Sequence, residues 1–449
     1  MQTTRIAMED ASFPYRLGTD CAEDVVARLA ALEASSYLVV ADTTVAELYG
    51  AALTAHIDKE AGPSHLLTHE VGEVHKTLAT VSALAEQALG RGADRRSVVV
   101  ALGGGVTGNI AGLMASLLFR GIRLVHVPTT VVAMLDSVLS LKQAVNTTFG
   151  KNLAGTFYQP VEVLADTAAL RTLPPREIRS GMGEVVKNAL AIRPAMLDRL
   201  AGALRPDTRY DDETMRWIIA ESLAAKADVT SGDKHERRSG LVLEYGHTAG
   251  HAIEHASRGA VAHGAGVAVG MTLAAEVSRR LGHADAGLVA LHRELVAAAG
   301  VEPAVPDHVD TALVKNWLAY DNKRGYLDSP PGHTPMVLLS APGEVLHTGT
   351  MPLVPVPLAL LEEVVDESAA RGGAGGGAAE PAAARTGPVP DGPEAAVPAT
   401  PGPVPAGPAA AAPLPSGPAP TASGMVPVCS TSPGAESSTI GVWPGGLSR

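Results

Sequence analysis

Short apolar runs alternate with longer amphipathic segments over residues 1–180. The runs SYLVVAD (36–42), RSVVVALGGG (96–105) and IRLVHVPTT (122–130) have the length and β-branched content of strands. Each ends in polar residues or glycine, and VTGNIAGLMASLLFRG (106–121) between the last two has the composition of a crossover helix. The pattern predicts an α/β sheet with a binding site at the strand ends.

The pattern changes in the second half of the chain, where helical periodicity dominates from residue 174 to about residue 320. Its clearest segments are PPREIRSGMGEVVKNALA (174–191), ETMRWIIAESLAAKADV (213–229) and AVGMTLAAEVSRRLG (268–282). We therefore predict an α/β domain at residues 1–180 and a mostly helical domain at 181–368. Residues 369–449 are rich in Gly, Ala and Pro and bury too little apolar surface to offset ordering, so we predict a disordered tail there.

Composition narrows the partners and the compartment. The 449 residues carry a formal net charge of −12, which argues against nucleic acid as the main partner because phosphate backbones require a basic face. The two cysteines, Cys21 and Cys429, cannot build a disulfide framework and fit a reducing compartment. No signal peptide and no apolar run of about 20 residues is recognised, so a cytoplasmic protein without a membrane partner is expected.

The glycine-rich turn ALGGGVTGN (101–109) follows a predicted strand and opens a predicted helix. Its glycines let backbone amides approach a pyrophosphate at the helix N-terminus, where the helix dipole favours anions. It departs from G-x-G-x-x-G, and a plain tight turn is the alternative. Asp42 could accept hydrogen bonds from a ribose diol, or could equally cap a helix. Together these features indicate a nicotinamide dinucleotide.

Five lysines stand in small-residue segments of this acidic chain. A lone lysine is usually a solvated surface residue, but several in such segments favour a small anionic substrate, above all a phosphate. The five are Lys142, Lys151, Lys187, Lys226 and Lys323.

Residues 240–255, GLVLEYGHTAGHAIEH, space three histidines four residues apart. On a helix, His247 and His251 would share one face and could bind zinc, with His263 and Glu184 as further candidates. An isolated pair of this kind is about as often an ordinary polar feature of a helix. With so few cysteines, a metal site would use nitrogen and oxygen ligands, which suits Zn²⁺ or Co²⁺.

The chain resembles the sugar phosphate cyclases, the dehydroquinate synthase-like superfamily, from about residue 10 to residue 350. The resemblance rests on segments that occur in the family's order: GEVHKT, GGGVTGNIAG, FRGIRLVHVPTT, DSVLSLKQAVN, GKNLAGTFYQP, TLPPREIRSGMGEVVKNA, EYGHTAGHAIEH, HGAGVAVGM and DNKRG. It implies Glu184, His247 and His263 as metal ligands and moves His251 to the substrate.

The resemblance also implies the remaining site residues. It implies a homodimer in which Arg120 reaches the substrate phosphate across the interface. Other substrate contacts would come from Asp136, Lys187, Lys226, His251 and Lys323. NAD would contact Asp42, Glu73, Val74, His75, Lys76, Gly105, Val106, Thr107, Gly108, Asn109, Thr129, Thr130, Ser140, Leu141, Lys142, Lys151 and Asn152.

Departures from the dehydroquinate synthase pattern bear on the substrate. Gly240 stands where that enzyme has an arginine that holds a substrate carboxylate, and its loss should cost such a substrate several kcal/mol. Glu244 replaces an asparagine, would repel a carboxylate and would suit a hydroxyl-rich neutral ring. Against this contrast, Lys226 is retained at a position that the family links to carboxylate binding. Asn109 also replaces an aspartate expected near the nicotinamide.

With these departures, the resemblance implies a redox-neutral lyase sequence on glucose 6-phosphate that yields a carbocycle for aminoglycoside antibiotics. It comprises transient oxidation by NAD, phosphate elimination, re-reduction and intramolecular aldol closure, with Lys142 and Glu244 as the acid–base pair. Three alternatives stay open: a cyclase of sedoheptulose 7-phosphate, a cyclase of the dehydroquinate type, and a metal-dependent polyol dehydrogenase.

Overall fold

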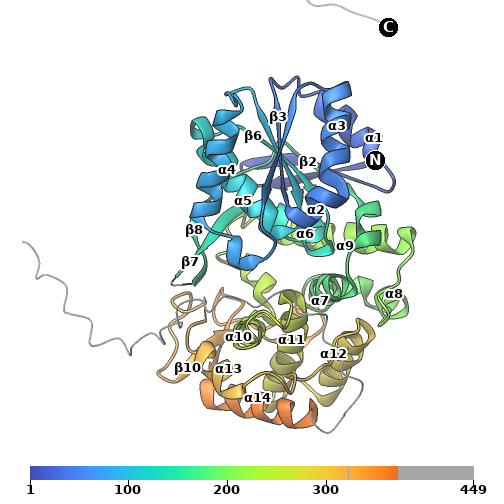
Figure 1. The fold of residues 1–449 in the computed structure, drawn as a ribbon. Helices are drawn as coiled ribbons and strands as arrows, with labels where there is room; N and C mark the ends of the chain where they lie inside the picture. Colours follow the sequence, from blue (N-terminus) through green and yellow to red (C-terminus); the bar gives the residue numbers. More distant parts are fainter. Residues whose placement is uncertain (149, 322, 373–449) are drawn as a thin grey trace, which may run out of the picture. The chain divides into compact units, whose positions relative to one another are not determined.

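The computed structural model describes residues 1–148, 150–321 and 323–372. Its N-terminal half contains a seven-stranded sheet in the order β1-β2-β9-β6-β5-β3-β4 (Figure 1). Strands β1 and β2 pair as an antiparallel hairpin, and the other neighbours are parallel. The strands are β1 (Gln2–Met8), β2 (Ala11–Gly18), β3 (Tyr37–Asp42), β4 (Ser64–His69), β5 (Val98–Gly103), β6 (Arg123–Pro128) and β9 (Glu162–Asp166). The predicted α/β class is therefore confirmed.

Helices cover both faces of the central strands. One core cluster joins Leu38 and Val40 of β3 to helices α4 and α5, and another joins Tyr37 and Val39 of the same strand to α1 and α3. This alternation follows from the two-residue period of a strand, and it explains why β3 reads as a continuous apolar run. The helices are α1 (Ala22–Ala30), α3 (Ala51–Glu60), α4 (Leu78–Gly90) and α5 (Gly105–Leu117).

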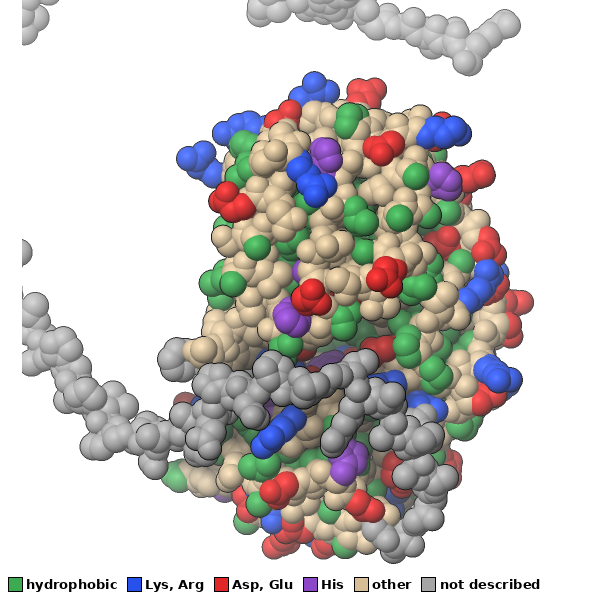
Figure 2. Space-filling model, in the orientation of Figure 1, with side chains coloured by type: hydrophobic (Ala, Val, Ile, Leu, Met, Phe, Trp, Pro, Cys, Tyr) green, Lys and Arg blue, Asp and Glu red, His purple; other side chains and the backbone are tan. Residues whose placement is uncertain are grey.

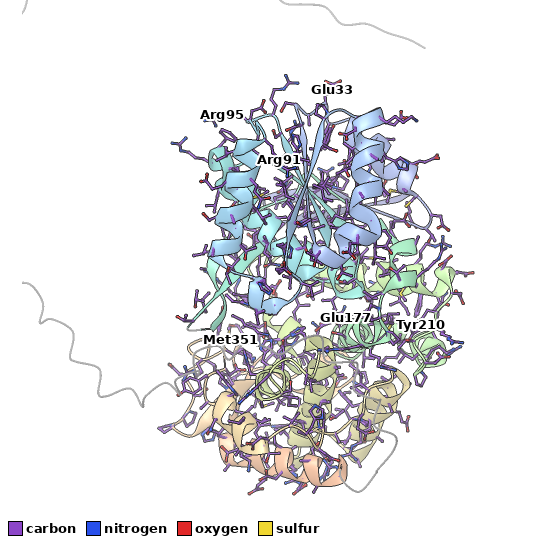
Figure 3. The ribbon with its side chains drawn as sticks, viewed as in Figure 1. Glu33, Arg91, Arg95, Glu177, Tyr210 and Met351 are labelled. Carbon is purple, nitrogen blue, oxygen red and sulfur yellow. The ribbon has the colours of Figure 1, made fainter. Side chains whose placement is uncertain are left out.

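The parallel strands share one polarity, so the loops after their carboxyl ends gather at one edge of the sheet. Figure 3 labels Glu33, Arg91 and Arg95 together at the opposite edge, where β3 and β5 begin. The predicted cofactor segments follow β3, β4, β5 and β6 and therefore lie at the carboxyl edge.

The C-terminal half is mostly helical, as predicted, and adds only short strand pairs. A large apolar cluster runs through its helices. The helices are α7 (Pro175–Ala191), α8 (Leu197–Ala203), α9 (Asp212–Thr230), α10 (His247–Ala256), α11 (His263–Arg280), α12 (Ala286–Ala298), α13 (Thr311–Leu318) and α14 (Leu358–Gly372). The short helix α6 (Val131–Leu135) of the N-terminal half also packs in this cluster. The strands pair as β10 (His333–Met336) with β13 (Val354–Pro357) and β11 (Leu339–Ala341) with β12 (Glu344–Val345).

An antiparallel ribbon of β7 (Lys142–Thr147) and β8 (Gly150–Phe157) was not predicted. Its residues are polar or small and lack the alternation of a half-buried strand, so periodicity does not reveal it. Val145 anchors the ribbon in the core beside α5, while Leu153 and Phe157 stay exposed. The ribbon carries Lys142, Lys151 and the residues around them.

The last described helix extends further than the sequence indicated. α14 continues to Gly372, four residues beyond the predicted end of the folded chain at 368. Buried Ser368 accepts a hydrogen bond from the backbone N–H of Val305, and Ala369 packs on the core, which holds this turn in place. From residue 373 onward the predicted tail lies outside the described residues. In the described part of the chain, no helix combines the length and apolarity needed to span a bilayer.

Candidate metal and dinucleotide site

Helices α7 and α11 cross with almost no side chain between them. A Cβ at Gly264 would lie 1.8 Å from the carbonyl oxygen of Ser180, and a Cβ at Gly183 would lie 2.1 Å from the carbonyl oxygen of Gly264. These glycines allow backbone to touch backbone. The close approach places Glu184 Oε1 3.4 Å from His263 Nε2.

Three histidines converge beside this carboxylate. One ring nitrogen from each of His247, His251 and His263 lies within 4.8 Å of the others, and His247 Nε2 is 3.8 Å from Glu184 Oε1. The Nδ1 of His247 donates to the Tyr245 carbonyl at 3.1 Å, which leaves Nε2 directed at the carboxylate. The structure thus brings together all four residues considered as metal ligands.

The electrostatics of this cluster favour a cation. Burial lowers the pKa of His263, but hydrogen bonds to Glu184 and Glu254 outweigh it and raise this pKa to about 10. Burial lowers the pKa of His247 and, more strongly, that of His251, so both rings are neutral at pH 7. The Glu184 carboxylate faces His263 Nε2 through Oε1 at 3.4 Å and forms an ion pair with Lys187 through Oε2. Buried carboxylate and imidazole donors around one point fit a divalent Zn²⁺ or Co²⁺ ion.

Three buried lysines of the predicted substrate set each have a carboxylate partner. Lys187 Nζ is 2.5 Å from Glu184 Oε2, and Lys226 Nζ is 2.5 Å from Asp136 Oδ1. Lys323 Nζ lies 2.9 Å from Asp321 Oδ2. Burial alone would lower the pKa of Lys226, but the charges of Asp136 and its neighbours outweigh it, so this pKa is raised and the lysine stays charged.

The two predicted acid–base residues lie beside these lysines. The Lys142 side chain is 40% exposed, and its Nζ is 2.5 Å from Glu236 Oε2. Glu236 Oε1 is 4.0 Å from Lys226 Nζ. Glu244 Oε2 is buried without a hydrogen bond, 3.6 Å from Lys323 Nζ. Burial raises the pKa of Glu244, but the surrounding positive groups outweigh it and hold this pKa well below its usual range. Glu244 is therefore an anion.

A side chain at position 240 would meet the side chains of Asp233 and Glu236. A Cβ there would lie 2.9 Å from Asp233 Oδ2 and 3.1 Å from Glu236 Cβ. Asp233 Oδ2 also accepts a hydrogen bond from the Gly240 N–H at 2.9 Å. The turn Ser239–Glu244 is therefore closed around position 240 and lined with carboxylates.

The predicted dinucleotide residues occupy the carboxyl edge of the sheet. Asp42 ends β3 and caps α2 (Thr43–Val45) by accepting a hydrogen bond from the Val45 N–H, so its capping alternative is realised. A ribose contact remains a prediction for Asp42. Gly104 precedes α5 in an extended conformation, as the glycine-rich turn requires. Asn109 donates to the Gly105 carbonyl and accepts from the Ala144 N–H, which ties α5 to the ribbon.

The remaining predicted cofactor residues lie in three nearby segments. Loop 73–76 follows β4, and its Lys76 is buried, which lowers the pKa of this lysine. Thr130 caps α6 by accepting a hydrogen bond from the Ala133 N–H. The ribbon begins after Leu141, which has a positive φ of 53°. The other predicted cofactor residues lie in or beside these segments and on the first turn of α5: Val74, His75, Val106, Thr107, Gly108, Thr129, Ser140 and Asn152.

Two residues singled out from the sequence lie apart from this cluster. His255, the third of the spaced histidines, stacks on Trp317 at 4.7 Å between ring centroids. Arg120 lines a surface cavity of about 470 Å³ with Leu78, Leu117 and Tyr158. Lysine and arginine side chains are interspersed with acidic ones over the described part of the face in Figure 2, which shows no basic patch there.

Sequence reasoning missed several carboxylates of the site. Glu236 lies in DKHERR, a charge run that is typical of a solvated loop. Glu254 lies three residues after His251 on the same helix, and that spacing was an available signal. Asp321 lies two residues before its partner Lys323, within the segment DNKRG. Each was missed because its partner comes from another segment or because a charged loop residue carries little information.

The family models for 3-dehydroquinate synthase match the chain over residues 66–180 for the N-terminal part and 181–324 for the C-terminal part. An α/β half with a glycine-rich turn and a helical half with converging histidines define a dinucleotide- and metal-dependent class of enzyme. The chain belongs to the 3-dehydroquinate synthase family of sugar phosphate cyclases.

Within this family, the chain is most informatively compared with individual relatives. The chain is 86% identical to the 2-deoxy-scyllo-inosose synthase of Streptomyces ribosidificus, over 88% of this chain and 100% of that protein. It is 76% identical to the 2-deoxy-scyllo-inosose synthase of Streptomyces lividus, over 83% of this chain and 97% of that protein. A crystal structure of 2-deoxy-scyllo-inosose synthase with carbaglucose-6-phosphate, NAD⁺ and Co²⁺ shares 39% identity and a TM-score of 0.78, covering 82% of this chain and all of that one. The resemblance inferred from the sequence is confirmed.

Proposed function

We propose that the chain is a carbocycle-forming lyase that converts D-glucose 6-phosphate to 2-deoxy-scyllo-inosose and phosphate. The observation that carries the substrate choice is the turn from Gly240 to Glu244. Gly240 supplies no side chain that could bind a carboxylate, the carboxylate residues Asp233 and Glu236 lie against it, and Glu244 is ionised. A substrate carboxylate would meet like charge there, whereas ring hydroxyls can donate to Glu244. The high identity to synthases of this activity supports the same conclusion.

Residues of this chain would hold two groups. Glu184, His247 and His263 would hold a Zn²⁺ or Co²⁺ ion, and the carboxyl edge of the sheet would hold NAD. When bound, these supply a Lewis acid that polarises a substrate oxygen and a reversible hydride acceptor. The neutral His251 ring lies against the rings of His247 and His263, where it would contact a substrate hydroxyl beside the ligands.

Lys142 and Glu244 would move the protons of the reaction. Lys142 is the more exposed of the site lysines and sits on the ribbon, and the Glu236 carboxylate keeps its Nζ in one place. Glu244 is an anion beside Lys323 and is therefore a base rather than an acid in the resting site. Lys187, Lys226 and Lys323 would supply positive charge toward the substrate phosphate.

The test measures phosphate release from three substrates in parallel: glucose 6-phosphate, sedoheptulose 7-phosphate and a carboxylated heptulosonate phosphate. Release from glucose 6-phosphate without net absorbance at 340 nm is expected, with the carbocycle identified by mass. Preference for either other substrate overturns the substrate assignment and supports one of the rival cyclases. Steady accumulation of NADH without phosphate would instead indicate a polyol dehydrogenase. The His247→Ala variant is the inactive control.

We also propose a homodimer in which Arg120 reaches the partner's site. The cavity beside Arg120 is bordered by exposed apolar side chains, with Leu117 57% and Leu78 53% exposed. Mixing inactive Arg120→Ala and His247→Ala chains tests this. If Arg120 acts across the interface, exchange should restore about a quarter of wild-type activity, because half of the dimers are mixed and each has one complete site. No recovery after verified subunit exchange contradicts the arrangement.

The domain assignment and the compartment complete the proposal. The α/β domain at 1–180 would bind the dinucleotide, and the domain at 181–368 would carry the metal ligands and most substrate contacts. A cytoplasmic location in an antibiotic-producing cell is proposed from the cysteine content and the sugar phosphate substrate.

A further inference from the structure

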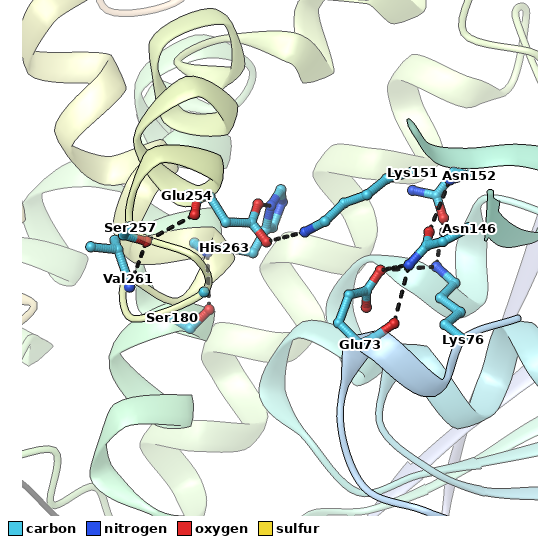
Figure 4. Close-up of polar contacts among 12 residues, drawn as sticks. Glu73, Lys76, Asn146, Lys151, Asn152, Ser180, Glu254, Ser257, Val261 and His263 are labelled. Atoms are coloured by element: carbon cyan, nitrogen blue, oxygen red, sulfur yellow. Dashed lines mark hydrogen bonds and ion pairs between the residues drawn. The ribbon is translucent and has the colours of Figure 1, made fainter. Parts of the chain in front are cut away.

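Glu254 on α10 contacts both sides of the site but has no part in the proposed reaction. Its Oε1 lies 2.6 Å from Lys151 Nζ, and its Oε2 lies 3.2 Å from His263 Nδ1 (Figure 4). The side chain is 13% exposed. The Glu254 carboxylate thus accepts one hydrogen bond from Lys151 of the ribbon and another from His263 of the histidine cluster.

On the histidine side, this contact determines which ring nitrogen of His263 faces the cluster. With Nδ1 donated to Glu254, Nε2 is left 3.4 Å from Glu184 Oε1 as the ligand atom. A carboxylate that holds the outer nitrogen of a metal-binding histidine fixes both its tautomer and its orientation. Glu254 is itself held, because its carbonyl accepts from Ser257 Oγ, which accepts from the Val261 N–H.

On the ribbon side, the polar contacts continue to the loop after β4. Next to Lys151, Asn152 Oδ1 accepts from Lys76 Nζ at 2.6 Å, and the Asn152 N–H donates to Asn146 Oδ1 at 3.0 Å. Asn146 Nδ2 donates to Glu73 Oε1 at 2.9 Å. Figure 4 shows these contacts as two groups, Glu254 with His263 and Lys151, and Asn152 with Lys76, Asn146 and Glu73, which are joined by the backbone between Lys151 and Asn152. Glu73 and Lys76 of the second group are among the residues proposed to hold NAD.

We propose that Glu254 is a positioning residue that couples metal binding to dinucleotide binding through His263 and Lys151. The inference rests on the proposed function, in which these residues border the metal and NAD. Binding of either group orders the carboxylate for the other, so the second group binds more tightly. By linkage the enhancement must be equal in both directions.

The experiment uses the full-length chain and measures two affinities. NAD⁺ affinity is measured by titration calorimetry with and without Co²⁺, and Co²⁺ affinity by its d–d absorption with and without NAD⁺. In the wild type each group should strengthen the other by roughly 5- to 150-fold. In Glu254→Gln the enhancement should fall to near one, and Co²⁺ affinity alone should weaken by about 10- to 100-fold. An amide has one acceptor oxygen, so it cannot serve both donors.

Two further variants separate coupling from general damage. Lys151→Met should also abolish the enhancement but leave Co²⁺ affinity in the absence of NAD⁺ near that of the wild type. Glu276→Gln is the matched control, since Glu276 lies on the His263 helix and pairs with Arg279 and Arg280 instead. It should retain the full enhancement.

The outcomes are distinguishable. A wild-type enhancement of one, or full enhancement in both Glu254→Gln and Lys151→Met, overturns the coupling and leaves the proposed function intact. Failure of the wild type to bind Co²⁺ or NAD⁺ removes the proposed function and the inference with it. If Glu254→Gln does not fold, as judged by circular dichroism, Lys151→Met alone decides.

Discussion

Tyr245 contacts two histidines with different polar surroundings, His292 through its hydroxyl and His247 of the metal-site cluster through its carbonyl. His292 is fully buried, its Nδ1 donates to the Leu288 carbonyl at 2.7 Å, and its Nε2 pairs with the Tyr245 hydroxyl at 2.7 Å. In the histidine cluster and its surroundings, by contrast, the buried Oε1 of Glu236 and Oε2 of Glu244 have no hydrogen bond and lie 4.0 Å and 3.6 Å from Lys226 and Lys323.

This difference in hydrogen bonding separates a structural pair, Tyr245 and His292, from the histidine cluster of the site. Buried polar groups that satisfy one another stabilise the folded chain and need no ligand. Buried charges left without hydrogen bonds cost free energy, and they persist where a bound group completes them. The Tyr245–His292 pair is therefore structural, and the histidine cluster is built to bind. The following predictions test that contrast.

The largest effect should come from removing a ligand of the cluster. His247→Ala should lose the bound metal and reduce turnover by about 10³-fold or more, since Lewis-acid polarisation supplies several kcal/mol. Metal content by elemental analysis and phosphate release measure the two effects. His255→Ala on the same helix is the control and should keep its metal, because His255 stacks on Trp317 instead. Normal metal content in His247→Ala would contradict the ligand assignment.

Removing an acid–base group should slow the reaction without emptying the cluster. Glu244→Gln and Lys142→Met should each lower kcat by about 10²- to 10⁴-fold, with metal content and unfolding midpoint unchanged. The glutamine keeps the shape of the side chain and removes its charge and basicity. Near-normal activity of Glu244→Gln would show that the carboxylate has no catalytic role.

A packing change should damage the cluster indirectly. Gly264→Ala places a methyl group against the Ser180 carbonyl and must separate α7 from α11, which should cost about 1–3 kcal/mol of unfolding free energy or more. Metal affinity should fall with it, because His263 moves away from Glu184. Gly202→Ala in α8 meets no atom within 4 Å and should stabilise the chain by up to about 1 kcal/mol. Urea unfolding of the two variants measures the contrast.

The smallest effect on activity should come from the structural pair. Tyr245→Phe leaves His292 Nε2 without a partner and should cost about 1–3 kcal/mol of stability, whereas a double change that also converts His292 to Phe should be nearly neutral at pH 7. Both variants should retain their metal. A large loss of turnover in the double variant would show that this pair also serves the site.

The same pair predicts a pH dependence. Burial lowers the pKa of His292 to about 4, so below its ordinary value near 6.5 the unfolded chain takes up a proton that the folded chain does not. Stability should therefore fall between about pH 6.5 and pH 4, by up to about 1.4 kcal/mol per pH unit from this residue. The double variant should lack this part of the slope in urea unfolding at several pH values.

Much of the fold follows from local sequence patterns. The strands around Tyr37–Asp42 and Val98–Gly103 and the glycine turn between β5 and α5 are contiguous signals, because backbone pairing and phosphate-cradling turns use adjacent residues. The β7–β8 ribbon was missed because its stability comes from contacts with α5 and loop 73–76 rather than from its own alternation.

The sequence by itself determined the α/β and helical halves, the family, and the residue types available for metal, NAD and phosphate. Only the tertiary structure decided how these meet: that Gly183 and Gly264 bring Glu184 to His263, that Gly240 is closed by Asp233, and that Glu254 joins His263 to Lys151. The physical reason is that periodicity and turn chemistry act between neighbours in the chain. Ion pairs and metal ligands act through space, between residues that only helix packing brings together.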